Sequence, residues 1–242
     1  DGFAPPPGVN DYPFSIVVGA QVPPAVGTAM AMRRRNEANC VVVNFGDGAF
    51  SQGSIAESLN FAAVDKAPVI FVCENNGWAI STPMKRQTNV DSLAIRGMGY
   101  GVPSICVDGN DILAMMVATR DAADRARRGE GPTLIEAVTF RMSLHTTADD
   151  PTRYVPAEEL EEARRNDPTE RLRAHLVERG LWDDEAHTAT EAAALARFDE
   201  AFDRARTTPI APDAVLDHCT TVDSQRLARQ RALLLDPEGA ES

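Results

Sequence analysis

Two short segments carry the residue types that hold a metal-bound phosphate group. Gly46-Asp47-Gly48 and Glu74-Asn75-Asn76-Gly77 each follow an apolar run. Glycines let the backbone approach an anion closely. A carboxylate, an amide oxygen and a backbone carbonyl suit octahedral magnesium, and substrate phosphates complete its shell. Each segment alone is also typical of an ordinary turn, but the pair at this spacing predicts a site for magnesium and a phosphate-bearing ligand.

The first part of the chain has the pattern of alternating strands and helices that could position such a site. Unbroken apolar runs indicate strands covered on both faces, and strands that alternate with helices indicate parallel crossovers. The expected fold class is therefore α/β with a doubly wound, mostly parallel sheet. Ligands bind at the carboxyl ends of strands in such sheets, so Asp47 and the asparagines would face one crevice if their strands are neighbours. The expected strands are residues 40–45, 68–73, 104–107 and 133–138, and the expected helices are residues 24–34, 54–64 and 112–127.

The composition becomes charged and helical after residue 150. Pro156 is followed by Ala-Glu-Glu-Leu, which is typical of a helix start. Further helices are expected over residues 168–179, 184–206 and 222–234. We therefore predict an α/β domain over residues 1–150 and a C-terminal helical extension over residues 151–242.

Charge and cysteine usage exclude several classes of protein. The 242 residues carry a formal net charge of −12, which argues against nucleic-acid binding. The sequence contains no apolar run of about 18 residues and no charged-then-apolar leader, so we expect no membrane span and a cytoplasmic location. The four cysteines form no CxxC pair. Cys40, Cys73 and Cys106 are expected to be buried, reduced thiols in strands, and no zinc site is expected.

The wider sequence around the two segments resembles a known family. GDG followed by NN is similar to the thiamine diphosphate motif. VVGAQVP at 17–23, FGDGAFSQG at 45–53, CENNGWAIST at 73–82 and HTTADDPTRY at 145–154 look like the alpha subunit of 2-oxo acid dehydrogenases. The resemblance runs in order from about residue 17 to about residue 182. It implies the thiamine diphosphate-binding fold and the thiamine-dependent oxidative decarboxylation of pyruvate or a branched-chain 2-oxo acid, with acyl transfer to a lipoyl group.

The resemblance implies a set of residues around thiamine diphosphate and its Mg²⁺. Magnesium would be bound by the side chains of Asp47 and Asn76 and by the backbone carbonyl of Trp78. Gly48 and Ala49 would place their backbone against the diphosphate. Trp78 stands where the family often has tyrosine, which matters little if only its carbonyl binds the metal.

Further residues of the resemblance would contact the organic part of the cofactor and the acyl acceptor. Val18, with Ile16 nearby, would form an apolar wall beneath the cofactor. Arg141 would reach the diphosphate, although a surface ion pair is the structural alternative. His145 would contact the cofactor and act as the catalytic residue in acyl transfer, whereas an isolated loop histidine is usually only structural. The residues expected to order its loop by hydrogen bonds are Asp149, Asp150, Arg153 and Tyr154.

The resemblance also implies partners. It predicts a beta subunit in an α2β2 heterotetramer, which would supply a catalytic glutamate, and a lipoyl acyltransferase. It implies over a hundred preceding residues with further diphosphate contacts, which a separate chain could supply, so the chain alone should be inactive. Leu144 leaves the 2-oxo acid open. The alternatives are an acetoin-cleaving or other thiamine diphosphate enzyme subunit and a non-catalytic cofactor-binding partner, and the HTTADDPTRY segment favours the dehydrogenase.

Overall fold

The computed structural model describes residues 10–12, 15–209, 211–217, 222 and 224–236. The chain forms two compact units, Asp1–Arg179 and Gly180–Ser242. In the described residues no strand follows residue 138, and the elements beyond it are helices. The boundary between the units lies later than the expected domain boundary at residue 150, because two helices that follow residue 150 belong to the first unit.

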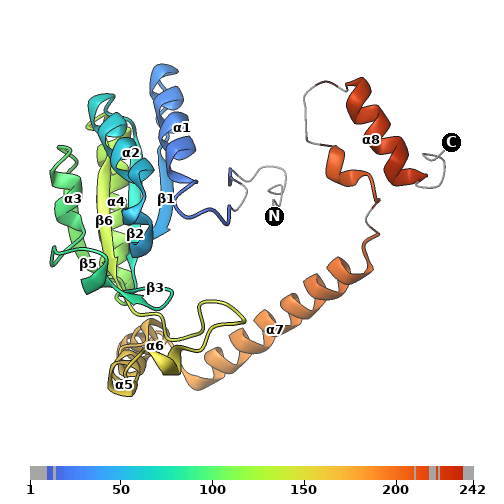
Figure 1. Cartoon of the computed structure of the whole chain (residues 1–242). Coiled ribbons are helices and arrows are strands. Elements are labelled where there is room, and N and C mark those ends of the chain that lie inside the picture. The colour runs from blue at the N-terminus through green and yellow to red at the C-terminus, as the bar shows by residue number, and fades with distance from the viewer. Residues whose placement is uncertain (1–9, 13–14, 210, 218–221, 223, 237–242) are drawn as a thin grey trace. The chain divides into compact units, whose positions relative to one another are not determined.

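The first unit is built on a four-stranded, fully parallel sheet (Figure 1). This arrangement confirms the predicted mostly parallel sheet and places the third expected strand at an edge. A separate two-stranded antiparallel hairpin, which was not predicted, follows the second strand. The sheet strands in spatial order are β1 (Val41–Gly46), β2 (Val69–Asn75), β6 (Thr133–Val138) and β5 (Ser104–Asp108), and the hairpin strands are β3 (Trp78–Ala79) and β4 (Thr82–Pro83).

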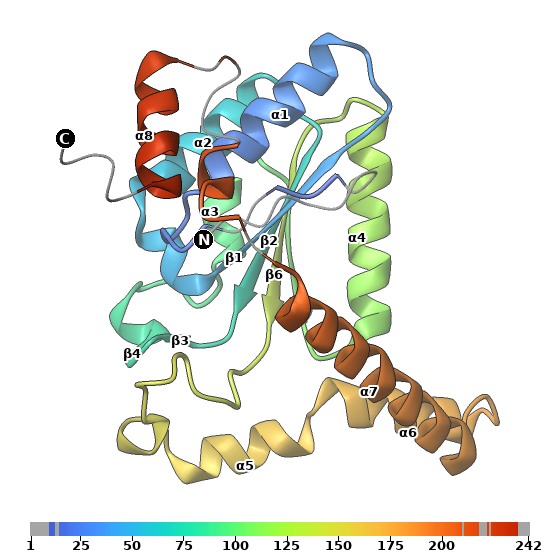
Figure 2. The same cartoon turned by 90° about the vertical axis from the view of Figure 1, so that its right-hand side faces the viewer.

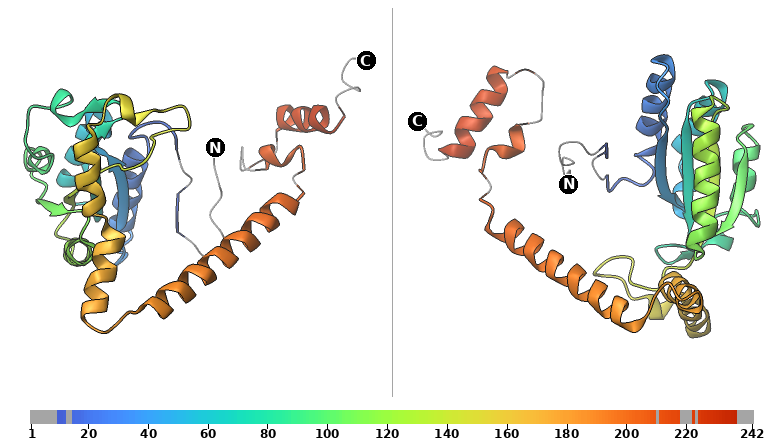
Figure 3. Two further views of the ribbon diagram at one scale, coloured as in Figure 1. Left: turned by 90° about the horizontal axis from the view of Figure 1, so that it is seen from below. Right: turned by 180° about the vertical axis from the view of Figure 1, so that it is seen from behind.

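Helices cover both faces of the sheet, which confirms the doubly wound prediction. On one face, α1 (Val22–Arg34), α2 (Gly53–Val64) and α3 (Ala94–Met98) lie over a core that includes Phe71 and Leu134. On the other face lies α4 (Ile112–Arg127) (Figures 2 and 3). It packs against a smaller core around Val72 and Ile135. The side chains of central strands alternate between these two cores, so β2 and β6 are apolar throughout most of their length.

Helix boundaries follow from local chemistry. In α1, prolines occupy the first turn, where no intrahelical amide bond is lost, and Val22, Ala25, Val26 and Ala29 form a buried stripe. Asp111 caps α4, because its side chain accepts hydrogen bonds from the amides of the second and third helical residues at 3.0 Å each.

The expectation that three cysteines are buried in covered strands is wrong for two of them. Cys73 is buried in central strand β2, but Cys106 is exposed and Cys40 is only half-buried. Cys106 lies on edge strand β5, and the residue before it, Ile105, is exposed as well, at 46%. A run of apolar residues cannot distinguish a central strand from an edge strand, because that difference depends on which strands pair. Cys219 lies outside the described residues.

The remaining α-helices lie close to the expected ranges, whereas the four short 3-10 helices among the described residues were not predicted. Each of the three helices α6 (Pro168–Glu178), α7 (Asp184–Thr207) and α8 (Gln225–Leu235) begins after a capping Asp or Ser. Gly180 adopts a left-handed φ of +66° just after α6, as helix C-termini favour. None of the helices in the described residues is both long and apolar enough to cross a membrane. The other elements are η1 (Asp47–Ser51), η2 (Met84–Arg86), η3 (Pro151–Arg153), α5 (Ala157–Arg165) and η4 (Ala214–Leu216).

Candidate functional site

The two motif segments lie at the same edge of the sheet. Strands β1 and β2 are direct neighbours, and their parallel register pairs Gly46 with Glu74. Asp47 begins the short helix η1, and its side chain is largely enclosed, with 3% exposure. The expected meeting of the two strand ends is therefore confirmed.

The Asp47 carboxylate is held by a residue that the sequence did not single out. Gln87 donates from Nε2 to Asp47 Oδ2 at 2.9 Å and also to the carbonyl of Thr82 at 3.2 Å. Gln87 follows η2, well beyond either motif, and an isolated glutamine after a short loop carries no signal of this role. The contact orients the carboxylate and links it to the β3–β4 hairpin.

Gly48 lies where the η1 segment comes very close to the hairpin. A Cβ atom on Gly48 would be 2.8 Å from the Cβ of Ala79 and 3.7 Å from its Cα. Such a separation is too short for two carbons, whose contacts are favourable from about 3.5 Å. The glycine is therefore required by packing against β3, which brings Asp47 beside the strand that contains Trp78.

The two asparagines have different surroundings. Asn75 is buried, and its Oδ1 accepts a hydrogen bond from the amide of Gly77 at 3.2 Å. Asn76 is half-buried, and its Oδ1 accepts from the amide of Trp78 at 3.1 Å. Gly77 has φ of +82°, a left-handed conformation that favours glycine. Both side chains therefore shape the turn, and Asn76 is in addition partly exposed.

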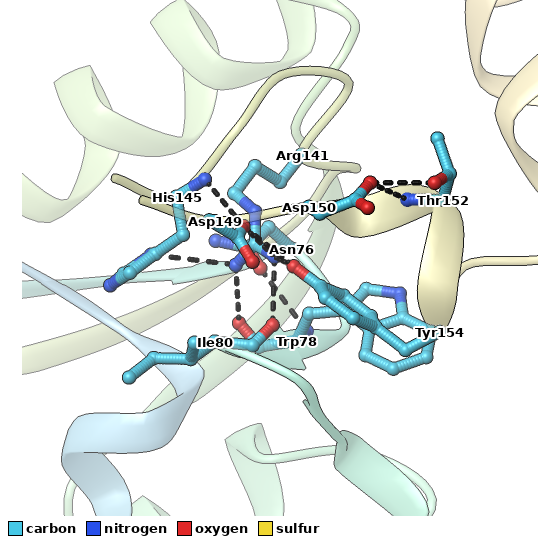
Figure 4. Close-up of polar contacts among 9 residues, drawn as sticks. All are labelled: Asn76, Trp78, Ile80, Arg141, His145, Asp149, Asp150, Thr152 and Tyr154. Carbon is cyan, nitrogen blue, oxygen red and sulfur yellow. Dashed lines mark hydrogen bonds and ion pairs between the residues drawn. The ribbon is translucent and has the colours of Figure 1, made fainter. Parts of the chain in front are cut away.

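Arg141 connects the hairpin to the segment that follows β6 (Figure 4). Its Nη1 donates to the carbonyl of Trp78 at 3.3 Å, and its Nη2 donates to the carbonyl of Ile80 at 2.7 Å and to the hydroxyl of Tyr154 at 2.8 Å. The Arg141 and Asp149 side chains are only 12% and 8% exposed, with 3.9 Å between Nη2 and Oδ2. This arrangement disfavours a plain surface ion pair.

The loop that contains His145 is closed by Asp149 (Figure 4). Asp149 Oδ2 accepts hydrogen bonds from the backbone amide of His145 at 2.8 Å and from the hydroxyl of Tyr154 at 2.7 Å. His145 Nδ1 lies 3.5 Å from Arg141 Nη1, and the imidazole is exposed. The ring of Tyr154 also packs on Trp78, with 5.2 Å between centroids. The loop therefore presents His145 next to the hairpin.

The remaining loop residues make more local contacts. Asp150 Oδ1 accepts hydrogen bonds from the amide and the hydroxyl of Thr152 at 3.2 and 2.6 Å, which caps η3. The amide of Arg153 donates to the carbonyl of Asp150 at 3.3 Å. These two residues shape the short helix, whereas the Asp149 and Tyr154 side chains reach across to Arg141 and the His145 amide.

Electrostatics keep this network in one protonation state. The hydrogen bond from the His145 amide, followed by that from Tyr154, lowers the pKa of Asp149. Burial and the hydrogen bond to Asp149 raise the pKa of Tyr154. The carboxylate is therefore ionised and the phenol protonated, so hydrogen bonds run in one direction from Arg141 through Tyr154 to Asp149.

Ile16 and Val18 lie in the turn before α1, with 74% and 57% exposure. Gln21 attaches this turn to the end of β1 through a 2.8 Å hydrogen bond from Nε2 to the carbonyl of Asn44. The turn therefore lies near the predicted crevice, but these two side chains are not packed into it. Ala49, in contrast, is 3% exposed and its methyl group belongs to the core.

The donor set fits a hard cation that shares a phosphate. Asp47, Asn76 and the Trp78 carbonyl all offer oxygen atoms on segments that follow neighbouring strands. The described residues contain no group of three or more His, Cys, Asp or Glu placed to hold a metal alone, so phosphate oxygens would have to complete a shell. Nε of Arg141 is buried without a hydrogen-bond partner, which leaves a donor available. Burial raises the pKa of the neighbouring Cys73 thiol, which disfavours a thiolate ligand.

Comparison with known proteins gives one family. Residues 5–213 match the family described as "Dehydrogenase E1 component". The chain is 52% identical over 170 residues to the 3-methyl-2-oxobutanoate dehydrogenase subunit alpha of Mycobacterium tuberculosis (strain H37Rv), covering 70% of this chain and 46% of that protein.

Two further relatives extend over more of the chain. It is 45% identical over 202 residues to the pyruvate dehydrogenase E1 component subunit alpha of Acholeplasma laidlawii, covering 83% of this chain and 59% of that protein. It is 44% identical over 202 residues to the 2-oxoisovalerate dehydrogenase subunit alpha of Bacillus subtilis (strain 168), covering 83% of this chain and 61% of that protein. The chain spans about half the length of the curated relatives it matches.

Proposed function

This chain belongs to the dehydrogenase E1 component family, and from that membership we propose that it is the cofactor-binding portion of a 2-oxo acid dehydrogenase alpha subunit. The proposed cofactors are thiamine diphosphate and Mg²⁺. The observation that carries the proposal is the meeting of the β1 and β2 ends, where enclosed Asp47 lies beside the turn formed by Asn75, Asn76 and Trp78.

The proposed reaction is the oxidative decarboxylation of a 2-oxo acid with transfer of the acyl group to a lipoyl group. The relatives are named for pyruvate and for branched-chain 2-oxo acids, and both substrates remain within the proposal. The proposed partners are a beta subunit in an α2β2 assembly and a lipoyl acyltransferase. A cytoplasmic location is part of the same proposal, supported by the free thiols of Cys40, Cys73 and Cys106.

Thiamine diphosphate, when bound, supplies the carbanion chemistry that decarboxylation needs. The residues of this chain would bind and orient it. Asp47, Asn76 and the Trp78 carbonyl would hold the metal, with Gly48 and Ala49 placing their backbone near the diphosphate. Asp47 and Asn76 directly follow β1 and β2, which would support these two ligands rigidly because both strands belong to the central sheet.

Arg141 and His145 would act at the open side of the site. Arg141 has one guanidinium nitrogen free of partners and is fixed by carbonyls of the hairpin, so it is positioned for a phosphate oxygen. His145 is held by its backbone amide through Asp149, and its exposed imidazole would transfer a proton during acyl transfer. Ile16 and Val18 remain exposed and available to an apolar ring.

Binding to the assembled complex tests the proposal directly. The chain with the remaining alpha-subunit sequence and the beta subunit should bind thiamine diphosphate in the presence of Mg²⁺, as measured by calorimetry. Asp47→Ala should abolish this binding because it removes the only carboxylate of the set. Glu130→Gln is the matched control, since Glu130 lies in a surface turn with Arg125 and Arg128. Unchanged affinity in Asp47→Ala would contradict the assignment.

Activity measurements define the substrate. The assembled complex should be assayed with pyruvate, 2-oxobutyrate, 3-methyl-2-oxobutanoate and acetoin. Turnover of a 2-oxo acid with reduction of the lipoyl acceptor is expected, and the chain alone should show none. Turnover of acetoin only, or robust turnover by the isolated chain, would contradict the proposed function.

A further inference from the structure

A buried carboxylate lies next to the candidate site without belonging to its expected ligands. Glu136 is in the middle of the central strand β6, directly beside Cys73 in the sheet register, and is only 1% exposed. An ionised carboxylate in a protein interior is unfavourable unless hydrogen-bond donors surround it. The donors that surround this buried carboxylate therefore show which parts of the chain it holds.

The two oxygens of Glu136 contact two separate segments. Oε1 accepts a hydrogen bond from Nδ2 of Asn75 at 2.7 Å. Oε2 accepts from the hydroxyl of Ser92 and from the backbone amide of Ala94, the latter at 2.9 Å. Burial alone would raise the pKa of Glu136, but these donors together with the amide of Leu93 outweigh it and lower the pKa. The group is therefore a carboxylate that only accepts hydrogen bonds.

The first segment is the turn that contains the proposed metal ligands. Because Nδ2 of Asn75 is engaged by Glu136, its Oδ1 is directed to the amide of Gly77. That contact sets the turn in which Asn76 and the Trp78 carbonyl lie. Rotation of the Asn75 amide by half a turn would place two donors, Nδ2 and the Gly77 amide, against each other.

The second segment follows the residue that orients Asp47. Gln87 holds the Asp47 carboxylate, and Ser92 and Ala94 lie a few residues further along the chain, at the start of α3. Glu136 therefore attaches the end of the segment from Gln87 to Ala94 to the central sheet. One carboxylate thus contacts both the turn that contains two of the proposed ligands and the segment that follows Gln87, the residue that hydrogen-bonds to the third.

We propose that Glu136 is a positioning residue, which sets the amide orientation of Asn75 and thereby places Asn76 and the Trp78 carbonyl for the metal. This inference rests on the proposed function. Glu136 does not touch the metal or the cofactor, and it acts through the turn. Outer-shell partners of this kind change metal affinity by about 10- to 100-fold when they are replaced.

Glu136→Gln isolates the role of the second acceptor oxygen. A glutamine whose oxygen serves Ser92 and Ala94 presents its NH₂ group to Nδ2 of Asn75. Either this contact is lost or the Asn75 amide rotates and loses the Gly77 contact. The double variant Glu136→Gln/Asn75→Asp restores a matched pair with the same total charge, because the aspartate can accept from both the glutamine and the Gly77 amide.

The experiment measures the Kd of Mg²⁺ at saturating thiamine diphosphate by calorimetry in the assembled complex, with the melting temperature recorded for every variant. We expect Glu136→Gln to raise this Kd by at least about tenfold and the double variant to recover most of the loss. Glu130→Gln, the same chemical change in the surface turn before β6, should leave the Kd unchanged. A lower melting temperature with an unchanged Kd would indicate a purely structural role and overturn the inference.

Ser92→Ala covers the case in which Glu136→Gln does not fold. It removes one donor to Glu136 without leaving a polar side chain unpaired at position 92, and we expect a weaker Mg²⁺ affinity in the same direction. An unchanged Kd in this variant would overturn the inference. Failure of the wild-type complex to bind either ligand would overturn the proposed function and this inference together, whereas wild-type affinity in Glu136→Gln would overturn the inference alone.

Discussion

Gly48→Ala tests whether the close approach of η1 to the hairpin is needed for the proposed metal site. The added Cβ would lie 2.8 Å from the Cβ of Ala79. Ala79 follows Trp78 directly in β3, so any displacement of Ala79 also moves the carbonyl that is proposed to bind the metal. The substitution therefore changes the distance between the two sides of the site without removing a ligand.

The size of the expected loss of Mg²⁺ affinity follows from contact distances. Contacts between two carbons are favourable from about 3.5 Å. The added Cβ would be 2.8 Å from the Cβ of Ala79, so the hairpin must move away by about 0.7 Å. Overpacking of this kind costs about 1–3 kcal/mol of folding stability. Magnesium requires oxygen ligands at about 2.0–2.1 Å in near-ideal octahedral geometry, so a shift of this size should displace the Trp78 carbonyl. We expect the Kd for Mg²⁺ to rise at least about tenfold.

Calorimetric titration of the assembled complex and thermal melting provide the measurements. Gly27→Ala is the matched control, because nothing lies within 4 Å of a Cβ at that position in α1. It should leave the Kd unchanged and stabilise the helix by about 1 kcal/mol. Gly48→Ala/Ala79→Gly should recover binding, since the nearest remaining Ala79 atom in the original geometry is its Cα at 3.7 Å. Wild-type Mg²⁺ affinity in Gly48→Ala, or no recovery in the double variant, would refute the reasoning.

Three further predictions concern two residues of the loop and the protonation of Glu136 in β6. Tyr154→Phe removes the hydroxyl that accepts from Arg141 and donates to Asp149, so limited proteolysis within residues 141–154 should become faster while the melting temperature changes little; unchanged cleavage would count against the network. His145→Ala should impair acyl transfer to the lipoyl group more than decarboxylation measured with an artificial electron acceptor, and equal losses in the two assays would contradict its proposed role. Because the pKa of Glu136 is lowered in the folded chain, its contribution to the free energy of unfolding should be present above about pH 4.3, the usual unfolded value for glutamate, and lost as the pH falls through the folded pKa. The free energies of unfolding of wild type and Glu136→Gln, measured with urea, should become equal at acid pH. A difference between them that persists at the lowest pH would contradict this assignment.

Local patterns predicted the secondary structure well where the signal lies in neighbouring residues. The bounds of α4 and β6 coincide with the expected ranges 112–127 and 133–138. Apolar periodicity, capping residues and glycines act over a few residues, so they can be recognised without knowledge of the rest of the fold. In contrast, α3 and the β3–β4 hairpin are short and were not predicted, because tertiary contacts rather than local preference stabilise elements of this length.

The sequence by itself identified the residues that are proposed to carry the chemistry, because GDG and NN each follow an apolar run that indicates a strand. That these two strands are neighbours was decided by the tertiary structure. Only the tertiary structure decided how those residues are held. Gln87 orients Asp47, Glu136 engages Asn75, and Ala79 leaves no room for a side chain at Gly48. These partners lie on other elements of the chain, and their contacts depend on strand order and packing, which no spacing within a motif encodes.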